Sequence, residues 1–176
     1  MAIYALGDKI PEIAKSAYIH PQASVIGNVK IGERVFVAPM ASIRGDIGSI
    51  EIGDESNVQD GAVIHSAEEH DTILGKRVNV GHNASIHANI LHDNVAIGIG
   101  AVVMLHCVVA EGVLIGNSAL LHPKTKTEPY KIYAGVPAKY IRDLQPDDPA
   151  RKAIERYVQT YIGNTTRYPE GLRRLD

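Results

Sequence analysis

The stretch SVIGNVKIGERVFVAPMASI, from Ser24 to Ile43, places an aliphatic residue at every sixth position. These residues are Val25, Ile31, Val37 and Ile43, and a small or branched aliphatic residue usually follows four places later. An amphipathic helix would need apolar spacings of three and four, and a half-exposed strand would need strict alternation, so neither fits. A six-residue period is the sequence sign of a parallel β-helix.

The same period extends outward from this stretch in both directions. It starts at Ile19, slips briefly at residues 48–51, and is interrupted once by SAEEHDTI at residues 66–73. A single five-residue step then precedes Leu91. The later leading aliphatic residues are Ile52, Val58, Ile64, Leu74, Val80, Ile86, Leu91, Ile97, Val103, Val109, Ile115 and Leu121. Because each six-residue rung makes one flat side and a corner, three rungs make one coil of a triangular prism.

We therefore predict an all-β solenoid, a parallel β-helix of hexapeptide repeats with a C-terminal α-helix packed alongside. An ordinary β-sandwich is the less favoured alternative because its strand spacing is irregular. The β-helix domain is predicted over residues 1–122, and residues 123–176 are predicted to form a connector and a helix on the same domain. The helix is expected to begin at Asp148-Pro149, a capping residue followed by proline, and to stop at Gly163.

Composition excludes several classes of partner. The net charge is −2 and the basic residues are scattered, which argues against a nucleic-acid or acidic-membrane surface. The amino terminus lacks the pattern of a secretion signal, and no apolar run is long enough to span a bilayer, so we expect a soluble, cytoplasmic protein. Cys107 is the only cysteine and is interpreted as a small core residue.

Two stretches, residues 58–65 and 80–89, carry three histidines together with Gln59 and Asp60. We call the sides first, second and third, after the rungs that begin at Ile31, Val37 and Ile43. His65 and His87 directly follow the leading aliphatic residues of successive third-side rungs, in one column with Arg44. Stacked strands lie about 4.8 Å apart, so both imidazole rings can reach one metal ion.

His82 belongs to the second side, in a matching column with Asp60. Five extended residues between His82 and His87 could span roughly 16 Å, which is too far for both rings to share an ion within one chain. If the second side of one copy docks on the third side of another, His82 meets the other two histidines. A contact between two different faces is heterologous and closes naturally after three copies of a triangular prism. The register therefore predicts a homotrimer with metal sites shared between subunits.

The motifs RGD at Arg44–Asp46, QD at residues 59–60, IH ending at His65 and GHNASIH at residues 81–87 are similar to those of the gamma-class carbonic anhydrases. The resemblance covers almost the whole chain, including the YAGVPAK segment that other hexapeptide proteins carry. It implies a left-handed β-helix. It also implies a zinc lyase that reversibly hydrates carbon dioxide to bicarbonate with a metal-bound hydroxide at a trimer interface.

The resemblance assigns a role to each motif residue. His65 and His87 of one subunit and His82 of the next would hold zinc, with iron or cobalt as alternatives. Gln59 would hydrogen-bond the hydroxide or the bicarbonate. Arg44 and Asp60 would pair across the interface, with Asp46 in support, and such a charge-assisted pair is physically sensible at a subunit contact.

The sequence departs from the family pattern where protons would leave the site. Ile47 stands in place of a glutamate after the Arg-x-Asp motif, and the acidic loop after His65 is short. Glu68, Glu69 and His70 are the candidate proton shuttles, although a short charged loop is more often simply solvated. The helix residues Tyr157, Tyr161 and Asn164 could reach the site, although packing is the more ordinary role for tyrosines.

Several alternatives compete with carbon dioxide hydration. A hexapeptide acyltransferase uses coenzyme A and one histidine as general base, and has no reason to place two histidines in a column beside a third. A thioesterase-like relative or a catalytically weak metal-binding assembly protein would keep the ligands, so only an assay separates them. The other histidines are interpreted as surface or hydrogen-bonded residues: His20, His70, His92, His106 and His122.

Overall fold

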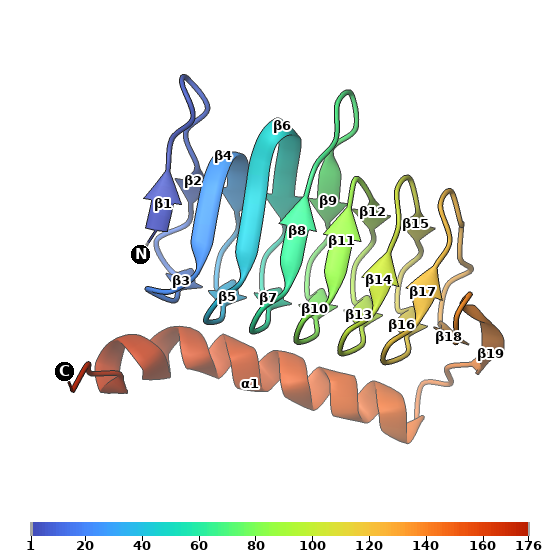
Figure 1. The fold of residues 1–176 in the computed structure, drawn as a ribbon. Coiled ribbons are helices and arrows are strands. Elements are labelled where there is room, and N and C mark those ends of the chain that lie inside the picture. The colour runs from blue at the N-terminus through green and yellow to red at the C-terminus, as the bar shows by residue number, and fades with distance from the viewer. Residues whose placement is uncertain (1, 176) are drawn as a thin grey trace.

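The six-residue rungs stack into a left-handed parallel β-helix of about seven turns, with one long helix beside it (Figure 1). The computed structural model describes residues 2–175. The predicted fold class is confirmed, because each coil contributes one short strand to each of three sides and neighbouring coils pair in parallel.

The strands are grouped by the side of the prism on which they lie. The third side holds β1 (Ala2–Tyr4), β8 (Val63–His65), β11 (Ser85–His87), β14 (Val102–Val103) and β17 (Leu120–Leu121). The first side holds β2 (Glu12–Ile13), β9 (Thr72–Leu74), β12 (Ile90–Leu91) and β15 (Val108–Val109). Two long strands, β4 (Ser24–Ile31) and β6 (Ser42–Ile52), bend across the corner and serve both of these sides.

The second side forms a separate sheet beneath the helix. Its parallel strands are β3 (Tyr18–Ile19), β5 (Phe36–Val37), β7 (Asn57–Val58), β10 (Asn79–Val80), β13 (Ala96–Ile97), β16 (Leu114–Ile115) and β18 (Lys131–Ala134). A last strand, β19 (Lys139–Asp143), pairs with β18 in the antiparallel direction.

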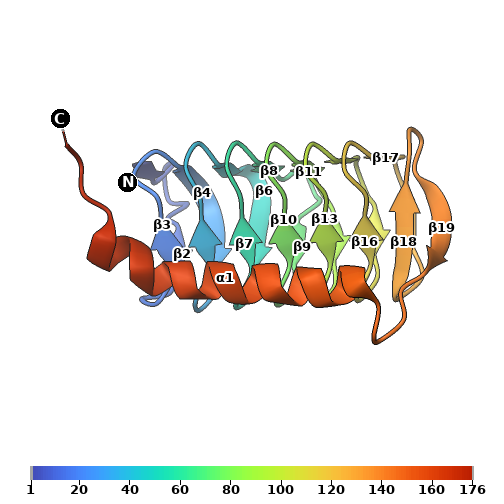
Figure 2. The same ribbon diagram turned by 90° about the horizontal axis from the view of Figure 1, so that it is seen from below.

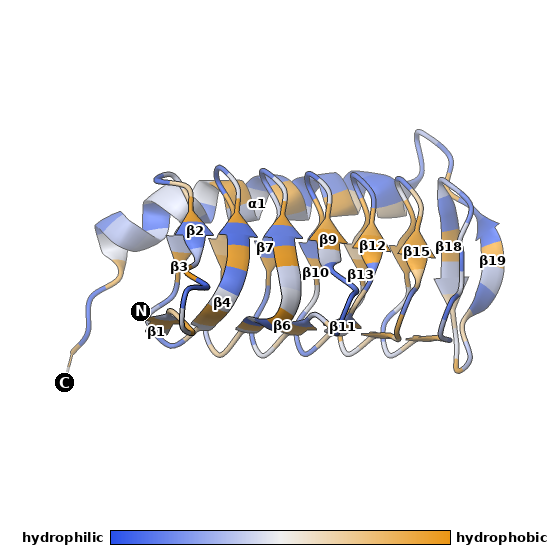
Figure 3. Cartoon of the chain, turned by 90° about the horizontal axis from the view of Figure 1, so that it is seen from above, coloured by the Kyte–Doolittle hydropathy of each residue, from blue (hydrophilic) through white to orange (hydrophobic). Residues whose placement is uncertain are grey.

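The leading aliphatic residues of the rungs fill the interior of the prism. On the third side, for example, Ile43, Ile64 and Ile86 are fully buried and stack in register. Hydrophobic colour is concentrated on strands such as β12 and β15 in Figure 3. Cys107 is also buried in this core, as predicted. Burial of apolar surface is the main favourable term in folding, so the period that predicts the coil also supplies its stability.

The β-helix extends beyond the predicted boundary at residue 122. Lys126 bridges to Val108 on the first side, and β18 stacks on β16 on the second side. Tyr133 takes the inward position that Ile115 holds one coil earlier. Within the segment predicted as connector and helix, residues 126–134 therefore add to the coil, with side chains such as Thr127 and Tyr133 that are not aliphatic.

The C-terminal helix α1 (Pro149–Gly171) lies along the second side, against β3, β5, β7 and β10 (Figures 1 and 2). Its predicted start is confirmed, since the side chain of Asp148 accepts a hydrogen bond from the Ala150 amide at 2.9 Å.

The predicted stop at Gly163 is wrong, because the helix continues to Gly171. A glycine inside a helix costs only about 1 kcal/mol relative to alanine. Tyr161 and Tyr168 on either side of it pack against Phe36, with ring centroids 5.5 and 5.0 Å away. These contacts hold the helix on the coil past the glycine. Across residues 2–175, no helix has the length and apolar character needed to cross a bilayer.

Candidate metal centre

His65 and His87 meet on the third side, at the ends of β8 and β11. The two residues are direct partners in the strand register, and Arg44 on β6 is the next partner in the same column. Nδ1 of His65 lies 3.2 Å from Nε2 of His87, and the ring centroids are 4.8 Å apart. The predicted column is therefore confirmed, and it brings two imidazole nitrogens to face each other.

Asp46 and Arg44 lie beside this pair. Asp46 Oδ1 is 2.9 Å from His65 Nε2, and the same carboxylate accepts a hydrogen bond from the Arg44 guanidinium. Gly45, between these two residues, lets β6 lie close to β4, because a Cβ there would lie 2.4 Å from the Asn28 carbonyl oxygen. Burial raises the pKa of Asp46, but the hydrogen bonds from His65 and Arg44 outweigh it and leave this pKa below its ordinary value. The carboxylate thus fixes the orientation of the His65 ring.

His87 is held in a form suited to ligation. Burial lowers its pKa, and the neighbouring His65 lowers this pKa further. A lowered pKa favours the neutral imidazole, which is the form that binds a metal ion.

His82 lies apart from this pair, in the turn that follows β10 at the corner between the second and third sides. Its Nδ1 is 2.9 Å from Asp60 Oδ2, and the two side chains are 40% and 51% exposed. Within the described part of the chain, no three His, Cys, Asp or Glu side chains converge to hold a metal ion. One chain therefore brings together two of the predicted ligands, and the predicted cross-subunit position of His82 stays a prediction.

Arg44 and Asp60 find partners inside the chain. Arg44 pairs with Asp46, and Asp60 pairs with His82. Their predicted pairing with each other across a subunit contact also stays a prediction.

Gln59 is fixed by two asparagines that sequence reasoning missed. Its Nε2 donates to Asn57 Oδ1 at 3.0 Å and to Asn79 Oδ1 at 2.9 Å, and only 6% of Gln59 is exposed. Both amide protons of Gln59 are then engaged, so its Oε1 is left to accept from a ligand. The sequence does contain a pattern that predicts this contact. Asn57 and Asn79 directly precede the leading valines of successive second-side rungs, and the two asparagines are register partners.

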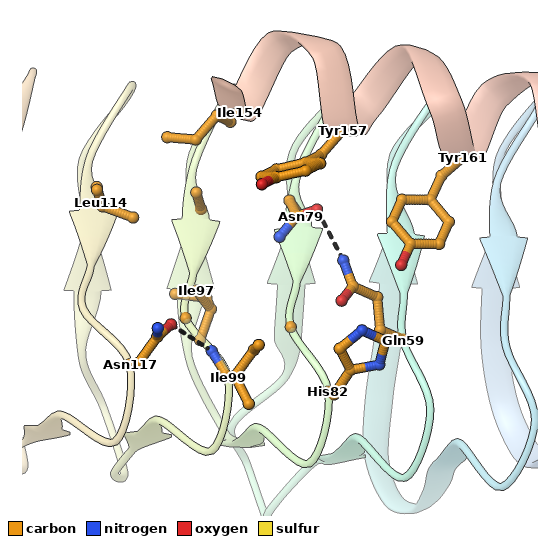
Figure 4. A pocket seen from close by; sticks show the side chains of 13 residues that line it. Gln59, Asn79, His82, Ile97, Ile99, Leu114, Asn117, Ile154, Tyr157 and Tyr161 are labelled. Carbon is orange, nitrogen blue, oxygen red and sulfur yellow. Dashed lines mark hydrogen bonds between the residues drawn. The ribbon is translucent and has the colours of Figure 1, made fainter. Parts of the chain in front are cut away.

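A cavity of about 360 Å³ opens between α1 and the second side, next to Gln59 and His82 (Figure 4). Of the helix residues proposed to reach the site, Tyr157 and Tyr161 line this cavity. Tyr161 also packs on Phe36, which confirms its packing role, and its predicted reach to the metal site stays a prediction. Asn164 is buried but is not among the lining residues.

The three candidate proton shuttles lie in the exposed loop between β8 and β9. Glu68, Glu69 and His70 are all exposed, and the His70 ring contacts the His106 ring with centroids 4.1 Å apart. Glu69, His70 and His106 also line a cavity of about 340 Å³ on the first side. The loop therefore places three solvent-exposed polar side chains at the corner between the third and first sides.

Comparison with known proteins identifies relatives along the whole chain. Residues 38–122 match the protein family described as GlmU-like, C-terminal hexapeptide. The carnitine operon protein CaiE of Proteus sp. (strain LE138) is 33% identical over 172 residues, which covers 98% of this chain and 86% of that protein.

Two solved structures share both fold and sequence. A hexapeptide transferase family protein from Anaplasma phagocytophilum is 29% identical with a TM-score of 0.89, and the match covers 95% of this chain and 98% of that one. A Bacillus cereus protein assigned provisionally as an acetyltransferase is 33% identical with a TM-score of 0.92, covering 96% and 97% of the two chains. Both of these proteins are named as transferases.

Proposed function

This chain belongs to the family of hexapeptide-repeat proteins that includes the carnitine operon protein CaiE. On the geometry of its histidines, we propose that it is a metal-dependent enzyme that reversibly hydrates carbon dioxide to bicarbonate. The metal ion would be zinc, or iron or cobalt, held between the subunits of a homotrimer by His65 and His87 of one chain and His82 of the next.

The observation that carries this proposal is the distance between the two third-side imidazole nitrogens. Two nitrogens bound to one zinc ion at about 2.0–2.1 Å, with a tetrahedral angle between them, lie about 3.4 Å apart. Nδ1 of His65 and Nε2 of His87 are 3.2 Å apart. Without an ion, the two neutral rings share an N–H···N hydrogen bond at this distance, and a metal ion would take the place of the shared proton. The donor set therefore fits a divalent metal ion.

The third ligand would come from a second copy. His82 is 40% exposed at a corner of the prism, so a neighbouring chain has access to it. Its contact with Asp60 would fix the imidazole orientation, as a carboxylate does for many metal-binding histidines. Three protein ligands leave one position open, which is the arrangement of a catalytic rather than a structural zinc site.

A bound zinc ion would lower the pKa of a coordinated water to about 7 and so supply a nucleophile at neutral pH. The chain's own residues would then position the reactants. Gln59 Oε1, with its amide turned by Asn57 and Asn79, would accept a hydrogen bond from the O–H of the attacking water or of bicarbonate. Hydration also releases a proton, and we propose the loop of Glu68, Glu69 and His70 as its route to solvent.

The decisive experiment separates a shared metal site from a site within one chain. Neither His82→Ala nor His87→Ala should retain the metal ion when each variant is purified alone. In trimers mixed from the two variants, one interface combines the intact third-side pair of one chain with the intact His82 of another. We expect mixed trimers to recover metal in elemental analysis, and to recover carbon dioxide hydration in stopped-flow assays.

Three outcomes would count against this proposal. Mixed trimers that stay metal-free would exclude the shared site, and a monomer in solution would do the same. Metal-loaded wild-type protein that hydrates carbon dioxide no faster than the His82→Ala variant, with either zinc or iron, would exclude the activity.

Acyl transfer from coenzyme A is the second candidate, with one histidine as general base. The names of the two similar solved structures favour it. Saturable binding of acetyl-coenzyme A by the trimer, with release of free thiol to an amine or alcohol acceptor, would support this reading. No saturable binding up to millimolar concentrations would leave hydration as the better candidate.

A further inference from the structure

The cavity beneath α1 arises from one small residue in an otherwise filled column. The outward-facing residues of the second side form a continuous column under the helix: Tyr18, Phe36, Asn57, Asn79, Ala96, Leu114 and Ile132. Tyr161 and Tyr168 of α1 pack on the aromatic end of this column. Ala96 has only a methyl group between Asn79 and Leu114, so the helix spans a gap there.

The walls of this gap differ from one end to the other (Figure 4). Leu114 and Ile154 make one end mainly apolar, with Ile99 and Asn117 at its lower rim, and Tyr157 reaches down from the helix above Asn79. Gln59, Asn79 and His82 make the other end polar. None of the described lining residues is Lys, Arg, Asp or Glu.

The polar groups of the cavity offer both a donor and an acceptor. Gln59 has its two amide protons engaged, so its Oε1 is an acceptor. Asn117 Oδ1 accepts from the Ile99 amide at 2.9 Å, which leaves the Asn117 amide as a donor. Asn117 lies at the end away from Gln59, so the head group at the polar end meets the acceptor Gln59 Oε1 and the ring of His82, whose Nδ1 already contacts Asp60. With no Lys, Arg, Asp or Glu among the described lining residues, a neutral head group fits this end better than a carboxylate or an ammonium.

The size of the cavity limits the ligand further. Ligand pockets typically measure about 300–1,000 Å³, so 360 Å³ is at the small end. It holds far more than one carbon dioxide molecule, and it is lined for a molecule that is apolar over most of its length.

We propose that this cavity is a binding site for a neutral amphiphile with a short aliphatic tail, such as a primary amide or an alcohol of about six carbons. The tail lies over Ala96 against Leu114 and Ile154, and the head group meets Gln59 and His82. The cavity shares Gln59 and His82 with the proposed metal centre, so hexanamide binding is measured on both the metal-free and the metal-loaded protein, and the inference requires it in the metal-free form.

The test uses three six-carbon probes that differ only in charge. Hexanamide, hexanoate and hexylamine are titrated into the full-length protein, and binding is measured by ligand-observed NMR and calorimetry. Hexanamide should bind saturably, and both charged probes should bind at least about tenfold more weakly because the cavity offers no opposite charge.

A substitution that fills the gap should abolish this binding. Ala96→Leu should weaken hexanamide binding at least about tenfold. Ala5→Leu makes the same change at an exposed position near the amino terminus and should leave the affinity within about twofold. If Ala96→Leu does not fold, Tyr157→Ala provides a second test. Tyr157 is 56% exposed, so its loss should leave the circular dichroism spectrum unchanged and weaken hexanamide binding several-fold.

Three results would overturn the inference: no saturable hexanamide binding to the wild-type protein, tighter binding of a charged probe, or unchanged binding by a folded Ala96→Leu variant. The outcome is separable from that of the proposed function. Hexanamide binding without carbon dioxide hydration would remove only the proposed activity. Hydration without hexanamide binding would remove only this inference.

Discussion

Two pairs of imidazole rings lie in contact in this molecule, and they differ in what holds them. His65 and His87 are strand partners, and a nitrogen of each ring faces the other at 3.2 Å. His70 and His106 are closer by ring centroid, at 4.1 Å, but they come from a loop and a turn. His70 Nδ1 is 3.0 Å from the Glu68 carbonyl oxygen, and His106 Nδ1 is buried without a hydrogen-bond partner.

The difference separates the two pairs by the orientation of their rings and not by the distance between them. Strand register fixes His65 and His87 on one face with their nitrogens converging, and Asp46 orients the His65 ring. Among residues 2–175, no carboxylate or strand partner orients the His106 ring in this way. We therefore expect metal binding to depend on the first pair and to be indifferent to the second.

The strongest test of this comparison replaces one ring of each pair. His65→Ala or His87→Ala should lower the affinity for zinc by more than about 100-fold, because a directly bound ligand is lost where an outer-shell partner alone is worth 10–100-fold. His70→Ala and His106→Asn are the matched changes in the second pair, and asparagine tolerates the positive φ of 62° at His106. Both should keep the metal content of the wild type in elemental analysis. Equal losses in the two pairs would contradict the comparison.

Asp46 should matter less than the ligands it supports. Asp46→Asn keeps the shape of the side chain but removes the charge beside His65 Nε2, so the affinity for zinc should fall by about 10–100-fold. Competition with a chromogenic chelator measures this directly. Asp71→Asn, in the loop near the second pair, is the control and should leave the affinity unchanged. A fall of the same size in both variants would show that general charge, and not orientation, is what matters.

Thr72 ties the backbone of the first pair together. Its hydroxyl donates to the His65 carbonyl oxygen at 2.6 Å and accepts from the Ala88 amide at 3.0 Å, and the residue is fully buried. Thr72→Val should reduce the free energy of unfolding by about 1–3 kcal/mol, because buried polar groups lose their partner. Thr125→Val removes an exposed hydroxyl with a similar bond to the His122 carbonyl and should cost less than about 0.5 kcal/mol in urea unfolding.

The smallest effect concerns the protonation of His87. Burial and His65 lower its pKa below the ordinary value of 6.5, so the folded, metal-free chain favours the neutral ring. This contribution to stability is fully present above pH 6.5 and is lost as the pH falls through the lowered pKa. An NMR titration of the metal-free protein should place the His87 midpoint below 6.5, and His65→Ala should move that midpoint upward. A midpoint above the ordinary value would contradict this.

Most of the fold follows from the sequence because the coil is periodic. Each leading aliphatic residue predicts a buried position, and the register of those positions predicts which outward residues share a column. The His65–His87 column therefore needs no knowledge of side-chain rotamers. The same argument places Asp60 and His82 together, which their 2.9 Å contact confirms.

The parts that sequence reasoning missed are those where packing decides. Tyr133 stacks in register on Ile115, but tyrosine is not typical of the inward positions of a hexapeptide repeat. The sequence pattern therefore predicts a connector where the structure has a last coil. The helix passes Gly163 because Tyr168 packs on Phe36, a contact between residues far apart in the chain. The cavity over Ala96 depends on where α1 crosses the second side, which no local pattern specifies.

The hairpin of β18 and β19 has a consequence for the solution behaviour of the protein. Parallel coils leave an open row of backbone donors and acceptors at their final edge, and such an edge recruits further strands. Here β19 runs antiparallel against β18, with a register shift near Ile132 and with both Lys139 and Arg142 on an exposed strand. Charged, irregular edges resist end-to-end growth into fibrils. Deleting this hairpin should thus expose the edge of the last remaining coil, and the protein should then associate end to end into fibrils through that edge.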